Sequence, residues 1–422
     1  MVRKFLLNVN PLILSAVIIS FLFYSGFLLP SSKNTEFCSL LALSDIEIVE
    51  GLVVGSPIKS EKGNKYFVNL LPFYVVSDNG FSSSCCGKIL VLVDAFAIES
   101  YFPDKLYTKG TEVGPVLCDN GAKLRIFGNF ISDDYLFSAN KINQLDWDSN
   151  LTGKLNYYRA LTRLEFRRLM YAFGDAGGLL LALITGMKEY INPVLFENFK
   201  KAGLSHILAL SGMHLSLFMG ISSLLFNKIF GKKLTNFINI FVIFFFVWFA
   251  GRSPSLTRAL ICSLLTIIVS SIGMKSISFA TILSLSFLIH CSIFPNDIMN
   301  IGFILSYGAL AGIVLCSKFI NQYLSFLFPT SISSPFASSI SAQVFTIPVS
   351  IHFFKCVPII GIVSTVFISP FINYFIYIGI FFIILCFSFP IFVPVAEFIL
   401  KILYNLINYF IYIFSCSPLI EV

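Results

Sequence analysis

The sequence predicts an α-helical polytopic membrane protein, with about 8–10 membrane helices and an N-terminal extracytoplasmic, OB-like β-barrel domain. Hydrophobic residues make up 56% of the 422 residues, charged residues only 12%, and the mean hydropathy is +0.85. Soluble domains carry about 25% charged residues, so this composition excludes an ordinary soluble enzyme and a disordered chain. Residues 203–422 hold successive apolar runs, whereas residues 31–150 are polar and rich in turns.

Residues 1–30 are the predicted N-terminal membrane anchor. Arg3 and Lys4 precede an apolar run from Pro11 to Pro30, which is about long enough to span a bilayer. A signal peptide is the alternative, although no clear Ala-x-Ala cleavage site follows the run. Basic residues before the run favour a cytoplasmic N-terminus, which places residues 31–150 outside the cytoplasm.

Residues 31–150 are predicted to form the OB-like domain, because alternating segments separated by Gly, Asn and Asp turns indicate short strands. The strands are expected at Ile46–Val54, Lys65–Val76, Lys88–Asp94, Leu124–Phe130 and Tyr135–Ala139. Acidic residues outnumber basic ones, giving a net charge of −5. An OB-fold that grips nucleic acid is usually basic along its groove, so this domain alone does not indicate DNA binding.

Four cysteines, Cys38, Cys85, Cys86 and Cys118, fall in the predicted barrel domain. An oxidising compartment permits a disulfide there. Cys118 with Cys85 or Cys86 and four free thiols are the alternatives, and the connectivity is left open.

Residues 151–202 are predicted to be a basic, amphipathic segment at the membrane interface. Arg159, Arg163 and Arg167 are spaced to share one helix face, with Arg168 beside them. Like charges at this spacing repel, so we expect an external anion. Lipid phosphate under an interfacial helix and a phosphate backbone passing over the helix are the two alternatives, and the four arginines are the phosphate-contact candidates.

The rest of the chain alternates apolar stretches with short polar links. Ala176–Thr185 is about half of a spanning length and is predicted to be re-entrant or interfacial. If the apolar run 203–226 crosses inward, lysines 228, 232, 233, 275 and 318 lie inside the cell, whereas Arg252, Arg258 and Lys355 lie outside. This is a modest excess of basic residues in the direction of the positive-inside rule. Longer apolar runs cover 203–226, 234–250, 255–273, 277–294, 299–316, 337–354, 358–388 and 391–415.

The densest polar cluster places His206, Ser211, Gly212 and His214 in the first of these runs. Ser-Gly inside a helix predicts a kink, which frees backbone groups that need partners in protein or in a water-filled cavity. Interhelical packing, cavity lining and catalysis by the two histidines are the alternatives.

Two more clusters interrupt the apolar runs. Pro254 suits the first turn of a helix, and Arg258, one turn later, needs an anion or carbonyl partner or must extend to the interface. Gln343 is predicted to be a buried amide that either forms an interhelical hydrogen bond or lines a cavity. Asp297 and Glu397 are the only acids between Glu197 and Glu421. Two carboxylates are few for a relay of protons across the membrane.

The sequence lacks the residue motifs that several classes of enzyme require. The chain has four histidines and none of the HxH, HExxH or HxxEH spacings, which argues against zinc hydrolases. It has no G-x-x-x-x-G-K-[ST] loop for ATP hydrolysis and no G-x-S-x-G elbow. We therefore predict no enzyme, no catalytic residues, no metal and no cofactor.

The run from Gly203 to His214, GLSHILALSGMH, resembles the GLSHLLAISGLH signature of the ComEC competence family. Gly251–Ala259, GRSPSLTRA, is similar to that family's G-x-x-PS-x-x-RA motif. Asn300–Gly308 is similar to its GFQLSF segment, with Ile304 where Gln is usual, and Ala342–Pro348 resembles its AQ-x-x-x-x-P stretch. The order of anchor, external domain, basic segment and polytopic domain is also that of the family.

This resemblance implies a multi-pass channel of the bacterial inner membrane that admits single-stranded DNA during natural transformation. The residues at matching positions are expected to shape or line the channel: Gly203, His206, Ser211, Gly212, His214, Pro254, Ser255, Arg258 and Gln343. Longer family members carry a C-terminal metallo-β-lactamase-like domain, whereas this sequence stops at Val422. The expected partners are single-stranded DNA, membrane lipids, a separate cytoplasmic motor and a separate nuclease, with a homo-oligomer left open.

Two other classes stay open at this point. A transporter or lipid-handling protein that retains the fold without DNA uptake fits the acidic barrel. An intramembrane enzyme built on His206 or His214 would need a nearby nucleophile, and Ser205 and Ser211 are the available residues.

Overall fold

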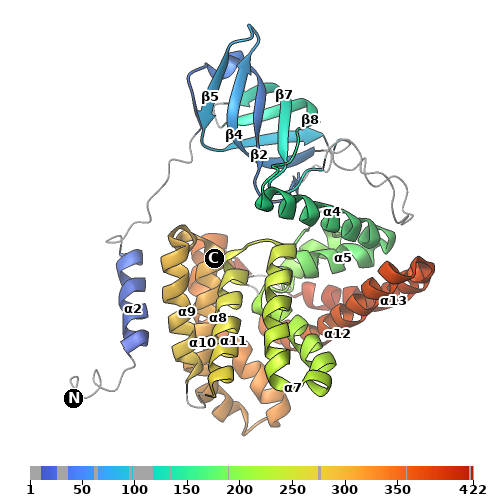
Figure 1. The fold of residues 1–422 in the computed structure, drawn as a ribbon. Helices are drawn as coiled ribbons and strands as arrows, with labels where there is room; N and C mark the ends of the chain where they lie inside the picture. Colours follow the sequence, from blue (N-terminus) through green and yellow to red (C-terminus); the bar gives the residue numbers. More distant parts are fainter. Residues whose placement is uncertain are drawn as a thin grey trace. The chain divides into compact units, whose positions relative to one another are not determined.

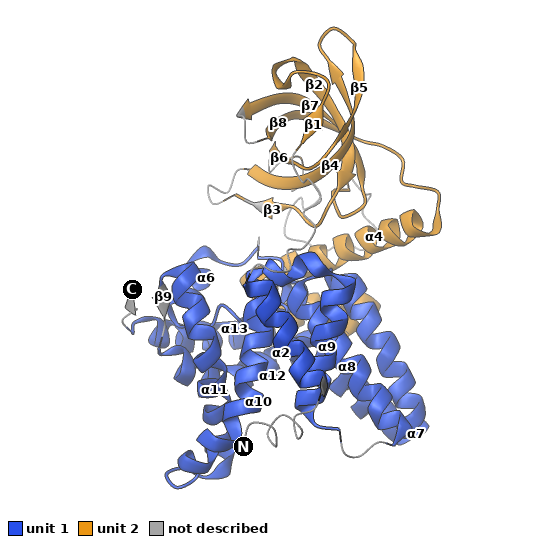
Figure 2. Ribbon diagram, turned by 90° about the vertical axis from the view of Figure 1, so that its left-hand side faces the viewer, with its two compact units in different colours: residues 1–31, 179–381, 399–422 blue, residues 32–178, 382–398 orange. Residues whose placement is uncertain are grey.

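The computed structural model describes residues 11–25, 37–60, 65–94, 97, 117–132, 135–188, 190–273, 277–357, 359–417 and 420–421. It divides into two compact units (Figure 2). The barrel unit comprises residues 32–178 and 382–398, and the helical unit comprises residues 1–31, 179–381 and 399–422. Arg3, Lys4 and the end of the predicted anchor run lie outside the described residues.

The barrel unit contains a closed five-stranded β-barrel (Figure 1). β4 pairs with β2 and β6, β2 pairs with β7, and β7 pairs with β8, all antiparallel, while a parallel β6–β8 ladder closes the ring. This Greek-key order confirms the predicted OB-like barrel. All five predicted strands are present: β2 (Ile46–Val53), β4 (Lys65–Ser77), β6 (Ile89–Asp94), β7 (Lys123–Ser132) and β8 (Leu136–Gln144). Short additions are β1 (Cys38–Ser39), η1 (Leu43–Asp45), β3 (Ile58–Lys59) and β5 (Ser82–Cys86).

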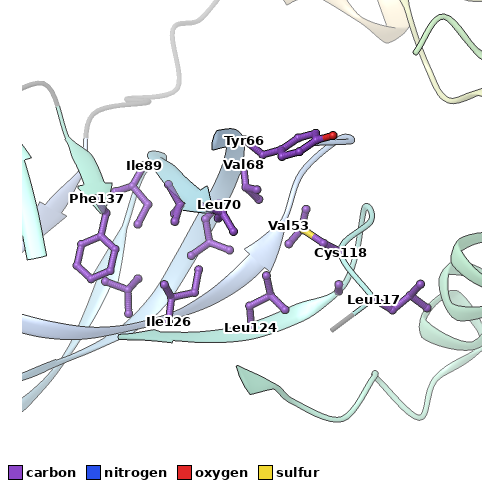
Figure 3. Close-up of a cluster of buried hydrophobic side chains, with 14 of the residues drawn as sticks. Val53, Tyr66, Val68, Leu70, Ile89, Leu117, Cys118, Leu124, Ile126 and Phe137 are labelled. Carbon is purple, nitrogen blue, oxygen red and sulfur yellow. The ribbon is translucent and has the colours of Figure 1, made fainter. Parts of the chain in front are cut away.

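The barrel interior is filled by alternate residues of its strands, as the period of two in a strand dictates. Val49, Val75 and Val91 are completely buried on three different strands. Figure 3 shows Phe137, Leu124 and neighbouring side chains gathered in this core. Burial of these side chains, rather than strand propensity, holds the five strands in one register.

Helix α4 (Leu151–Ala172) belongs to the barrel unit. It begins where Asn150 Oδ1 accepts the backbone N–H of Gly153 at 2.7 Å, a standard N-cap contact. Ala160 and Leu164, one turn apart, join the buried core of the barrel. The predicted segment 151–202 is therefore divided, because residues 179–202 belong to the helical unit.

Helices dominate the remainder of the chain (Figure 1). Their bounds are α2 (Pro11–Tyr24), α5 (Gly174–Thr185), α6 (Pro193–Lys201), α7 (Gly212–Ala250), α8 (Pro254–Ile272), α9 (Phe279–Ile293), η2 (Pro295–Met299), α10 (Ile301–Leu324), α11 (Thr330–Phe354), α12 (Gly361–Ser388), η3 (Pro390–Phe392) and α13 (Val393–Ser415), with β9 (Cys356–Val357) and β10 (Ile420–Glu421) as a short ladder. In the described residues, 6 helices are long and apolar enough to cross a membrane, and α2, α5 and α9 are shorter apolar helices. The predicted polytopic helical membrane protein is confirmed.

Helix α7 is two antiparallel arms joined at Gly231. Gly231 has φ 71°, outside the helical region, and glycine adopts such values without a Cβ clash. The rings of Phe218 and Phe246 lie 4.5 Å apart, and Asn239 Nδ2 donates to Ser223 Oγ at 3.0 Å, so the second arm folds back on the first. Each arm has about 19 residues and is about 28 Å long, close to the thickness of a bilayer core.

The short helices have partners within the helical unit. Residues Leu179–Ile184 of α5 are buried, which favours the re-entrant alternative over an interfacial one. Ala16 of α2 packs in one cluster with Leu283 and Phe287 of α9, so the described part of the predicted anchor is a helix of this bundle.

Candidate functional site

The segment 203–211 is not helical. Helix α6 ends at Lys201 and α7 begins at Gly212, so the prediction of one span broken at Ser211–Gly212 is wrong. Leu204, Ile207 and Leu208 are buried, whereas Ser205, His206 and Ala209 are exposed. His206 Nδ1 lies 3.2 Å from the carbonyl oxygen of Gly203.

Ser211 and His214 explain where α7 starts. They form a capping box in which the backbone N–H of Ser211 donates to His214 Nδ1 at 3.2 Å. A capping box satisfies backbone groups that the first turn of a helix leaves unpaired. The Oγ of Ser211 also lies 3.3 Å from the same nitrogen. Because Nδ1 already accepts the backbone proton, the pair has the geometry of a helix cap and not that of a nucleophile with its base.

Gly212 brings the first motif against the second. A Cβ at this position would lie 3.3 Å from Arg258 Nη2 and 3.4 Å from the Cβ of Ala259. The glycine therefore permits α8 to approach the first turn of α7. Helix α8 itself starts at Pro254, with Ser253 Oγ accepting the N–H of Leu256 at 3.3 Å.

The second motif also binds the third. Ser255 Oγ donates to the carbonyl oxygen of Gly302 at 3.1 Å. One turn along α8, Arg258 Nη1 donates to the carbonyl oxygen of Ser306 at 3.1 Å. Both acceptors lie in the first two turns of α10, so the motifs join the starts of α8 and α10.

Gln343 and Gly203 meet at the start of α12. A Cβ at Gly361 would lie 3.4 Å from Gln343 Nε2 and 3.4 Å from Gly203 Cα. Ser364 Oγ donates to the carbonyl oxygen of Ala202 at 2.6 Å. The first three motifs are thus joined by direct contacts within the helical unit, and Gln343 of the fourth lies beside Gly361 together with Gly203.

A network of hydrogen-bonded side chains that sequence reasoning missed lies beside these motifs. Arg252 donates to both carboxylate oxygens of Asp297, at 3.2 and 3.4 Å. His290 Nε2 lies 3.2 Å from Asp297 Oδ2, and its Nδ1 lies 3.4 Å from the hydroxyl of Tyr307. From the hydroxyl of Tyr307 the hydrogen bonds continue to Ser286 and from there to the thiol of Cys262. The available signal was that ionisable residues within spanning segments are costly and usually mark function.

The four candidate arginines of α4 are buried, with exposed fractions from 2% to 7%. Arg163 Nη1 lies 3.3 Å from Asp119 Oδ1, and its Nη2 donates to Ser56 Oγ at 3.0 Å. Arg168 Nη1 lies 2.8 Å from Glu165. Arg163 and Arg168 therefore each pair with a carboxylate of the barrel unit itself, where an external anion was expected. Contact of Arg159, Arg163, Arg167 and Arg168 with phosphate stays a prediction.

The cysteines of the barrel unit are placed by the sheet. The β1–β5 register sets Cys38 opposite Cys86, and Ser39 opposite Cys85. Cys38 and Cys86 are exposed free thiols, whereas Cys118 is buried in the core. Burial raises the pKa of the Cys85 thiol to about 11, with a further contribution from Cys86. In the described part of the chain, no three His, Cys, Asp or Glu side chains are placed to hold a metal ion.

Comparisons with known proteins were made with the whole chain. ComE operon protein 3 of Bacillus subtilis (strain 168) is 23% identical over 201 residues, which is 47% of this chain and 25% of that protein. This chain thus matches only a quarter of that relative's length. No solved structure matches significantly. The model of the family described as Competence protein matches residues 183–422, more than half of the chain and all four motifs. The chain therefore belongs to the Competence protein family.

Proposed function

We propose that the helical unit is a passage for single-stranded DNA and that the chain acts in DNA uptake during natural transformation. The observation that carries this proposal is the meeting of four polar motifs around the non-helical, partly exposed segment 203–211. In a membrane protein, such backbone is tolerated where protein buries it or where it lines a water-filled cavity. A chain of phosphates needs a polar path because hydrocarbon cannot solvate it. Membership in the Competence protein family supports the same role.

The distribution of lysines supports a direction for this passage. Lys228, Lys232 and Lys233 flank the bend at Gly231, and Lys318 lies near the end of α10. The first three motifs lie at the other ends of these helices. By the positive-inside rule the lysine end is cytoplasmic, so the motifs face outward in the inner membrane and transport runs inward. Arg3 and Lys4 before the N-terminal apolar run support the same direction, with residues 31–150 outside the cytoplasm.

The partners belong to the same proposal. The sequence has no P-loop, so a separate cytoplasmic motor supplies the energy, and a separate nuclease removes the second strand. Membrane lipids surround the exposed apolar faces of the helices.

The test is DNA uptake in a transformable host from which the gene has been deleted. Wild type, Gly212→Leu and the matched control Gly220→Leu are restored, because a Cβ at Gly220 meets nothing within 4 Å. Labelled DNA inside the cytoplasm is measured separately from DNA bound at the surface. We expect the deletion and Gly212→Leu to lose internalisation and keep surface binding, while Gly220→Leu behaves as wild type. Unchanged uptake in the deletion strain would refute the proposal and make a transporter or lipid-handling protein the leading interpretation.

A further inference from the structure

We propose that Arg258, His214 and the first turn of α7 form a binding site for a phosphodiester oxyanion of the single strand. This inference rests on the proposed function and names the contact that would hold the DNA backbone. Three separate observations support it: a buried cation without a carboxylate partner, a helix N-terminus against it, and a buried imidazole nitrogen without a partner.

Arg258 is a buried charge that the protein only partly satisfies. The residue is 7% exposed, its Nη1 donates to the carbonyl oxygen of Ser306, and its Nε has no hydrogen-bond partner. In the described part of the chain no carboxylate lies within ion-pair distance of it. A guanidinium stays protonated in proteins, and an unpaired buried charge is costly.

The sequence offers one acid in the long stretch that contains Arg258. Asp297 is the only Asp or Glu between Glu197 and Glu397. Its two carboxylate oxygens already bind Arg252 and His290. A ligand would supply the negative charge that the described residues do not place beside Arg258.

The start of α7 adds to the positive potential around Arg258. Arg258 Nη2 lies 3.3 Å from the place where a Cβ of Gly212 would be, at the first residue of that helix. A helix N-terminus carries a partial positive charge and presents backbone N–H groups, which favours an anion and disfavours a cation. An oxyanion at this point would turn an unfavourable pairing of two positive groups into a favourable one.

His214 supplies the third group. It is 1% exposed, and its Nδ1 is used by the capping box. Its Nε2, on the other edge of the ring, has no hydrogen-bond partner. A buried polar atom without a partner in the free protein is the expected state of a site whose ligand has yet to bind.

The size and geometry of the groups favour a phosphodiester. Arginine matches the paired oxygens of a phosphate with its planar fork, and helix N-termini bind phosphates recurrently. A nucleic acid backbone and a lipid head group share this chemistry. The backbone is the occupant we propose, because the site lies among the motifs that surround segment 203–211.

The test uses the full chain in phosphatidylcholine nanodiscs and a fluorescent 20-nucleotide thymidine strand. Anisotropy titrations over a range of salt compare wild type with Arg258→Gln, Arg258→Lys and the charge control Lys318→Gln. We expect Arg258→Gln to weaken binding by about 10- to 100-fold and to lower the slope of log affinity against log salt by about 0.7. Arg258→Lys should keep the slope, and Lys318→Gln should keep both values. A strand with a neutral methylphosphonate backbone should bind wild type weakly.

Arg258→Met keeps the proposal testable if the Gln variant folds poorly. If Arg258 has no negatively charged partner until DNA binds, an apolar side chain at this position should leave the thermal stability of the DNA-free protein equal or higher. The same substitution should abolish the increase in thermal stability that bound DNA gives. A lower stability of DNA-free Arg258→Met with an unchanged response to DNA would show a purely structural arginine and overturn the proposal.

The remaining outcomes separate this proposal from the proposed function. Normal affinity and salt slope of Arg258→Gln, together with loss of uptake in the deletion strain, would refute the site and leave the passage standing. Arg258-dependent binding of phosphatidylglycerol without any binding of the DNA strand would assign the site to lipid and overturn DNA as its occupant. Unchanged uptake in the deletion strain would refute the passage itself.

Discussion

Replacing Gly212 and Gly220 by alanine should change the stability of α7 in opposite directions. Both glycines lie on the first arm of the same helix. Gly→Ala inside a helix stabilises by about 0.5–1 kcal/mol, because the unfolded chain loses freedom. At Gly220 the new Cβ meets nothing within 4 Å, so Gly220→Ala should deliver this gain in full.

At Gly212 the same methyl group meets Arg258 Nη2 at 3.3 Å and the Cβ of Ala259 at 3.4 Å. The arginine is held by Ser306, and Ala259 is fixed in α8, so neither can move freely. Overpacking of this kind costs about 1–3 kcal/mol. Subtracting the helix gain leaves Gly212→Ala about 0–2.5 kcal/mol less stable than wild type, and about 1–3 kcal/mol less stable than Gly220→Ala.

The assay is unfolding of each purified variant in mixed micelles as the fraction of SDS increases, followed by circular dichroism. Gly212→Ala and Gly220→Ala are compared at the same protein concentration. Equal stabilisation by both substitutions would refute the close approach of α8 to the start of α7, and with it the joining of the first two motifs.

Three further predictions concern the ionisable groups. Asp119→Asn should destabilise the barrel unit by about 3–5 kcal/mol, because it removes the carboxylate that pairs with the buried Arg163 guanidinium; a change in unfolding free energy below about 1 kcal/mol would contradict the buried pair. Asp297→Asn should cost less, about 1–3 kcal/mol, since the side chain of its partner Arg252 is 51% exposed, and no added loss is expected from the double variant with Arg252→Gln. Because burial raises the pKa of Cys85 to about 11, its alkylation rate should increase about tenfold per pH unit from pH 8 to 10, as mass spectrometry can follow; a plateau near pH 9 would be inconsistent.

The barrel was readable from the sequence because strand signals are local. Alternation along β4 and the turn residues around it are properties of neighbouring positions, and all five strands fell within a few residues of prediction. The closing β6–β8 ladder joins segments separated by residues 95–135, and no local pattern reports such a pairing. Five short strands in one domain predict a small barrel, and only the structure shows their order.

The helical unit was predicted less completely, for a related reason. The apolar run 203–226 has the composition of a span, yet its first part is non-helical and the helix starts at Gly212. Ser211-Gly212 predicts a kink inside a helix, whereas in the structure Ser211 and His214 cap the beginning of one. The sequence shows Asp297 only as one of two acids between Glu197 and Glu421. Its partners Arg252 and His290 are brought to it by the packing of α8, α9 and α10.

The parallel ladder between β6 and β8 fixes the order in which the barrel can be completed during synthesis. Until residue 144 has emerged from the ribosome, β6 and β7 each keep one edge without its neighbour. Open strand edges recruit other strands, and pairings distant in sequence form slowly. A nascent or truncated chain that ends before β8 would therefore expose two unpaired strand edges, those of β6 and β7. It would be prone to aggregate until β8 pairs with both of them.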